Sequence, residues 1–162
     1  MQTDIKQNKF LKAMGIIHSA LLAGVCMFLV MAVVLVQLNG GALMAKVTQD
    51  LMYIFYAIVY FAALATAGFG NIIFERNMRN AKLFTMLKPK IDTFKSAYMI
   101  RMALAEGPAF VSIGIYMLTG SWHFLPATAL CLMLMFMSKP TQDFVAEKLY
   151  LNPEEKEQLL TI

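Results

Sequence analysis

The segment AMGIIHSALLAGVCMFLVMAVVLVQL, residues 13–38, contains no Lys, Arg, Asp or Glu, and it decides the fold class of the chain. A helix needs about 20 apolar residues to cross the hydrocarbon core of a bilayer, and this run exceeds that length. The run is too long for the apolar region of a signal peptide, and no small-residue cleavage pattern closes it. We therefore expect it to be retained as a transmembrane helix.

Three further apolar stretches reach or approach a spanning length, and they run from Leu51 to Phe74, from Ala97 to Leu118 and from Trp122 to Met137. The last is short, but bilayer thinning or its flanking residues can accommodate the mismatch. Hydrophobic residues make up 59% of the 162 residues and charged residues 15%, whereas soluble domains carry roughly 25% charged residues. The sequence predicts an all-α, polytopic membrane protein. Residues 1–162 would form a single four-helix transmembrane domain arranged as two hairpins.

The basic residues indicate which helix ends face the cytoplasm. They precede the first span, fill the connection between the second and third, and follow the fourth; the other two connections contain only Lys46. Under the positive-inside rule, both termini and the central connection are expected to be cytoplasmic. Because the cations are dispersed and lack interleaved aromatic residues, nucleic acid is not an expected partner. The three basic segments contain Lys6, Lys9 and Lys12; Arg76, Arg79, Lys82, Lys88, Lys90 and Lys95; and Lys139, Lys148 and Lys156.

The central connection, residues 75–98, is longer than a helical hairpin needs. It mixes cations with apolar residues, so part of it is expected to lie as an amphipathic helix at the lipid headgroups. A docking surface for a cytoplasmic partner is the alternative. The apolar residues concerned are Phe84, Met86, Leu87, Ile91 and Phe94.

The tail sequence NPEEKEQLL predicts a short cytoplasmic helix over residues 152–160. Asn152 can cap this helix, and Pro153 suits its first position. Glu154 and Glu155 complement the positive end of its dipole.

Small residues at four-residue spacing mark the expected helix contacts. Lipid provides no hydrophobic force between helices, so close approach through small side chains matters. The first span offers Gly15, Ser19 and Ala23, and the second offers Ala63 with Ala67 and Thr66 with Gly70. These faces could serve the bundle itself, a homo-oligomer or a larger membrane complex, and the pattern does not separate these uses.

Glu106 lies inside the third span, in ALAEGPAF. Counting at 1.5 Å per residue from a boundary near Tyr98 places it about 12 Å into a core about 30 Å thick. Its helical neighbours cannot satisfy a carboxylate, and its side chain is too short to snorkel easily. A neutral, hydrogen-bonded carboxyl group that ties helices together is one interpretation. The other is a proton or cation site, with His18, Thr66 and Thr128 as helpers.

Gly107 and Pro108 follow Glu106 directly. Proline removes one helical donor and clashes toward the carbonyl of Leu104, so a kink and a free acceptor are expected there.

The sequence carries no pattern typical of an enzyme or a cofactor site. It lacks GxSxG, HExxH, Walker and dinucleotide-binding motifs. His18 and His123 are expected near opposite membrane faces, so they cannot readily share a metal. Cys26 and Cys131 are interpreted as small buried hydrophobic residues. We expect neither catalysis nor a cofactor or metal.

Three short motifs carry a resemblance that covers most of the chain: ALAEGPAF, SKPTQD after the fourth span, and NPEE in the tail. With them the chain resembles a group of small four-span inner-membrane proteins of the Bacteroidota. The resemblance implies a bacterial inner membrane and no particular activity. The intramembrane Glu106 is also similar to that of rotary-ATPase proteolipids. However, the glycine-rich helix of that family is missing, and Glu106 lies on the first helix of its hairpin where that family uses the second.

These observations favour a small structural or accessory subunit that acts through helix contacts with itself or with a larger complex. The alternative is a proton- or cation-translocating component centred on Glu106.

Overall fold

The computed structural model describes residues 9–43 and 47–161, so Lys6 and Lys46 lie outside the described residues. Within these ranges the chain is helical and contains no strand. Three helices are long and apolar enough to cross a membrane, and a bent pair raises that number to four if it forms one span. These features are those of a helical membrane protein. The elements are α1 (Lys9–Leu38), α2 (Gln49–Ala81), α3 (Leu87–Thr119), the 3₁₀ turn η1 (Trp122–Phe124), α4 (Leu125–Met137), α5 (Gln142–Lys148) and α6 (Pro153–Thr161).

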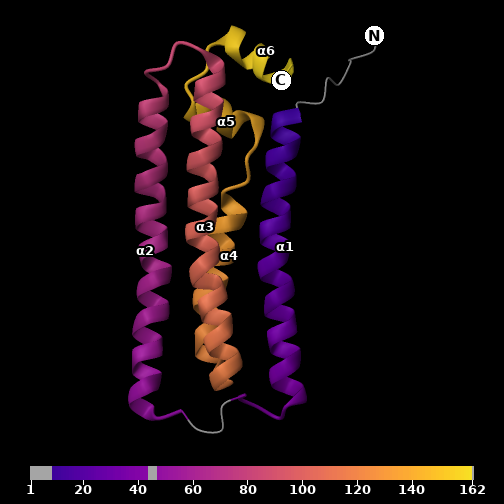
Figure 1. Cartoon of the computed structure of the whole chain (residues 1–162), viewed down its shortest axis with the longest axis vertical. Helices are drawn as coiled ribbons and strands as arrows, with labels where there is room; N and C mark the ends of the chain where they lie inside the picture. The colour runs from indigo at the N-terminus through magenta and orange to yellow at the C-terminus, as the bar shows by residue number, and fades with distance from the viewer. Residues whose placement is uncertain (1–8, 44–46, 162) are drawn as a thin grey trace.

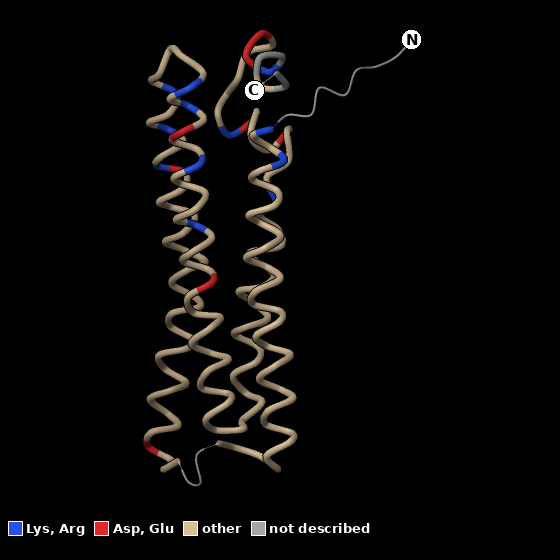
Figure 2. Tube along the Cα trace, turned by 45° about the vertical axis from the view of Figure 1, so that its right-hand side comes forward, with Lys and Arg blue, Asp and Glu red and all other residues tan. Residues whose placement is uncertain are grey.

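Helix α3 is the centre of the bundle. It packs against α1, α2 and α4, and α1 and α2 lie on opposite sides of it (Figure 1). The sequential pair α1 and α2 is therefore separated by α3 instead of packing as an isolated hairpin. Lysine and arginine gather at the end of the bundle that carries α5 and α6, whereas the long middle section is almost free of charge (Figure 2).

The fourth apolar stretch is not one continuous helix. It begins with η1, and α4 has only 13 residues, which span about 20 Å at 1.5 Å per residue. Beyond α4 the chain bends by 84° into α5. The bend coincides with Pro140, because a proline disfavours helical geometry at the residue before it and removes a helical donor.

The central connection differs from the expected headgroup helix. Helix α2 continues to Ala81 and α3 begins at Leu87, so only residues 82–86 lie between them. Leu87, Ile91 and Phe94 are buried inside the bundle, whereas Phe84 and Met86 are exposed. The expectation of a separate surface helix was wrong, because Leu87, Ile91 and Phe94 belong to the first turns of α3 and pack against neighbouring helices.

An aromatic cluster fills the bundle at this charged end. Phe94 is fully buried, and its ring contacts four others at centroid distances from 5.8 to 6.4 Å. Such offset and edge-to-face pairs add to the stabilisation that area burial provides. The cluster joins α1, α2, α3 and α5 through Phe10, Phe74, Phe94, Tyr98 and Phe144.

Two ion pairs connect the short helices α5 and α6 to the long helices α2 and α3. Lys148 of α5 lies 2.5 Å from Glu75 of α2, and Glu155 of α6 lies 2.5 Å from Lys90 of α3. Helix α6 also begins with a reciprocal cap: the Glu155 amide donates to Asn152 Oδ1 at 2.7 Å, and the Asn152 amide donates to Glu155 Oε2 at 3.1 Å. Glu155 therefore both starts α6 and attaches it to α3.

Acid is expected to release α6 from α3. The hydrogen bond from Lys90 holds the pKa of Glu155 below its usual value, assisted by the Asn152 amide and opposed by partial burial. The folded-state pKa is thus lower than the unfolded one, so the stabilisation is complete above the unfolded pKa of about 4.3 and is lost as the pH falls through the lowered folded pKa. Hydrogen exchange of the α6 amides across an acidic pH series measures this loss.

The matched control is the neighbouring exposed carboxylate, Glu154. Glu155→Gln should remove the acid-dependent step in α6 protection, and Glu154→Gln should keep it. Equal behaviour of the two variants would contradict the assignment of this step to Glu155.

Candidate functional site: polar residues within the bundle

Glu106 is half-exposed on α3, and it forms no hydrogen bond or ion pair with any residue that the structure describes. No hydrogen bond connects it to His18, Thr66 or Thr128, which each have other surroundings. Among the described residues, no hydrogen bond therefore links Glu106 to the three residues named as its helpers, and the ion site stays a prediction. A partner for Glu106 has to be supplied by a proton, by water or by another molecule.

His18 is bound to a residue that the sequence did not single out. Its side chain is buried, and Nδ1 lies 2.7 Å from the hydroxyl of Tyr98. This hydrogen bond joins α1 to α3 and satisfies two polar groups in the bundle interior. Tyr98 marked only the expected membrane boundary in the sequence, and no spacing rule related it to His18.

Thr66 binds the backbone next to the proline. Its hydroxyl lies 2.8 Å from the carbonyl of Leu104 on α3 and 2.9 Å from the carbonyl of Ala62 on its own helix. Leu104 is four residues before Pro108 and would otherwise lack a donor. The hydroxyl therefore satisfies a carbonyl that the proline exposes, which is a structural role. Gly107 and Pro108 lie inside helix α3, which continues to Thr119.

Thr128 is buried on α4, and its hydroxyl has no hydrogen-bond partner in the described part of the chain. A threonine in a helix commonly donates to the carbonyl one turn earlier, which here belongs to Phe124. That carbonyl instead accepts a 2.6 Å hydrogen bond from Ser112 of α3.

The other end of the bundle is held by tyrosines of α2. Tyr60 donates a 2.6 Å hydrogen bond to the carbonyl of His123, and Tyr56 stacks on Phe124 at 4.7 Å. The Tyr56 hydroxyl also lies 3.3 Å from that of Ser121. Tyr60 thus finds an interhelical partner, as an interior hydroxyl requires.

The small residues of α1 and α2 have different surroundings. On α2, Ala63, Thr66 and Gly70 are buried against the bundle, and Ala67 is half-buried. On α1, Gly15 is half-buried, whereas Ser19 and Ala23 are exposed, and the buried positions of this helix are others. A side chain built at Gly15 would meet nothing within 4 Å. The α1 residues therefore leave an open face.

Cys26 lies on the exposed part of α1 as well, and only Cys131 is buried. The interpretation of Cys26 as a buried hydrophobic residue was wrong, because the packed stripe of α1 passes through Val25 instead.

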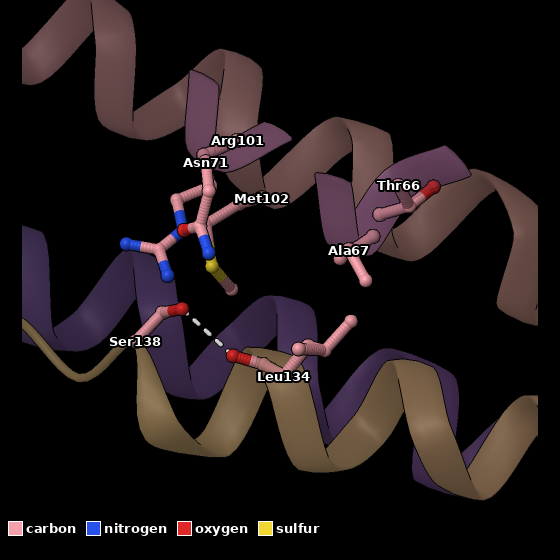
Figure 3. A pocket seen from close by; sticks show the side chains of 8 residues that line it. Thr66, Ala67, Asn71, Arg101, Met102, Leu134 and Ser138 are labelled. Atoms are coloured by element: carbon pink, nitrogen blue, oxygen red, sulfur yellow. Dashed lines mark hydrogen bonds between the residues drawn. The ribbon is translucent and has the colours of Figure 1, made fainter. Parts of the chain in front are cut away.

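A small cavity opens between α2, α3 and the end of α4 (Figure 3). Its volume is about 20 Å³, and its polar lining comes from Thr66, Asn71, Arg101 and Ser138. The Arg101 guanidinium lies 5.1 Å from the centre of the Phe74 ring. Its association with α2 and α4 depends on tertiary packing.

Comparisons with protein-family models, curated proteins and solved structures gave no match.

Proposed function

We propose that the protein is a structural or accessory subunit of the bacterial inner membrane, with both termini cytoplasmic, and that it acts by self-association through α1. The observation that supports this proposal is the outward position of the α1 small residues. They leave a face on which a second helix can approach closely, and close approach drives helix association in lipid. We refer to Gly15, Ser19, Ala23 and Cys26 as the α1 small-residue face.

Native cysteine cross-linking in membranes tests this proposal. Cys26 is exposed on the α1 small-residue face, and Cys131 is buried. Copies that meet through this face should give a covalent dimer under mild oxidation, and native-detergent mass determination should give an oligomer. Cys26→Ser should abolish the covalent dimer and Cys131→Ser should preserve it. A monomeric mass with no Cys26 cross-link would refute self-association.

Translocation of protons or cations through Glu106 is the second candidate, and the fact that its carboxyl group has no partner among the described residues favours it. This candidate requires flux in liposomes that Glu106→Gln abolishes. The accessory role requires that the wild type and this variant show the same flux as protein-free liposomes.

A further inference from the structure

We infer that the corner between α2, α3 and the end of α4 binds the phosphate group of an anionic membrane lipid, with Arg101 as its principal ligand. The inference is independent of the α1 small-residue face and of Glu106. It starts from the guanidinium group of Arg101, whose N–H donors have no hydrogen-bond acceptor among the described residues.

Arg101 is held between helices but lacks an acceptor. Its stem passes Gly70, where an added Cβ would lie 4.0 Å from Arg101 Cγ, and its charged group stacks on Phe74. It makes no hydrogen bond or salt bridge to any residue that the structure describes. A guanidinium has five N–H donors, and leaving them unsatisfied away from water is unfavourable.

The charge balance at this corner is positive. Glu75 interacts electrostatically with Arg101, but its carboxylate lies 2.5 Å from the Lys148 ammonium group. Two cations therefore face one carboxylate, and one positive charge remains. Asn71 adds a side-chain amide that has no partner among the described residues, and Ser138 lines the same cavity.

The depth of Arg101 suits a lipid headgroup. It lies four residues after Ala97, or about 6 Å inside the expected start of the apolar section. Helical side chains tilt toward the N-terminus, and the N-terminus of α3 is at the charged end of the bundle (Figure 2). The guanidinium is therefore directed toward the interface at which phospholipid phosphates lie.

The cavity fits part of a phosphate. A space of about 20 Å³ holds an atom group the size of one water molecule, so one phosphate oxygen can enter while the rest of the headgroup stays at the mouth. Arg101 and Asn71 both line this space, and the Ser138 hydroxyl donates to the carbonyl of Leu134 within the lining (Figure 3). A planar guanidinium can bind two phosphate oxygens at once, which an ammonium group cannot.

Native mass spectrometry of the full chain in mild detergent tests the site, with phosphatidylglycerol and phosphatidylcholine of matched acyl chains as probes. The wild type should retain phosphatidylglycerol in preference to phosphatidylcholine. Arg101→Gln should bind phosphatidylglycerol about tenfold more weakly, because a charge-assisted bidentate contact is lost. Arg101→Lys keeps the charge without the planar geometry and should give an intermediate loss.

Arg79→Gln is the matched control, because Arg79 is an exposed arginine on α2 at the same end of the bundle and does not line the cavity. It should bind phosphatidylglycerol as the wild type does. Equal losses in Arg79→Gln and Arg101→Gln would overturn the site. Displacement of the lipid by excess inorganic phosphate would assign the site to free phosphate instead. If Arg101→Gln does not fold, the retention of phosphatidylglycerol and phosphatidylcholine by the wild type tests the inference. Equal retention of the two lipids would overturn it.

Discussion

Phe94→Ala is expected to lower the free energy of unfolding by about 3–5 kcal/mol, the largest stability effect that we predict for a single substitution. Phe94 has no exposed surface, and its ring contacts residues of α1, α2 and α5 as well as Tyr98 on its own helix. Removal of the ring leaves a cavity at the point where four helices meet, and these helices cannot all move inward to fill it. Unfolding of the purified protein by SDS titration in mixed micelles measures the change.

Phe61→Ala is the matched control for this prediction. Phe61 is a phenylalanine on α2 with 74% of its surface exposed, so its truncation should change stability by no more than about 0.5 kcal/mol. If the two variants unfolded at the same SDS fraction, the aromatic cluster would not be the stabilising core of the charged end.

The long apolar helices could be predicted from sequence because spanning length is a local property. Residues 13–38 are uncharged throughout, and a run of that kind forms a helix in lipid wherever its neighbours lie. The continuation of α2 and α3 beyond the apolar section cannot be predicted from the local sequence. Phe94 follows several charged residues, and its burial among rings from α1, α2 and α5, together with the burial of Leu87 and Ile91, accounts for a helix that begins as early as Leu87.

Only part of the polar interior could be predicted from the sequence. Pro108 indicates that the carbonyl of Leu104 needs a donor, but nothing in the sequence selects Thr66 to supply it. His18 is named in the sequence only as a helper of Glu106, and nothing there indicates its actual partner, Tyr98 of α3, which is 80 residues away. The small residues of α1 and α2 follow the same spacing rule, yet the bundle covers one set and exposes the other. Spacing identifies faces suited to contact, whereas tertiary structure determines which of them remain available.

Ser19→Leu is expected to reduce the yield of the Cys26 cross-linked dimer about tenfold, the equivalent of about 1.4 kcal/mol. Ser19 is exposed in the α1 small-residue face. A leucine there holds a second helix away and removes a hydroxyl that can hydrogen-bond across the contact. Leucine is also more apolar than serine, so a lower yield cannot be attributed to poorer membrane insertion. The yield is measured by mild oxidation of intact membranes followed by non-reducing electrophoresis.

Ala20→Leu is the control, because Ala20 is also exposed but lies about 100° around the helix from Ser19. If copies meet through the α1 small-residue face, Ser19→Leu should lower the yield of the Cys26 cross-linked dimer and Ala20→Leu should leave it unchanged. Similar losses in both variants would mean that any added bulk on α1 disturbs association, and the specific face would have to be abandoned. An unchanged yield in Ser19→Leu would show that Cys26 meets its partner through random collision in the membrane.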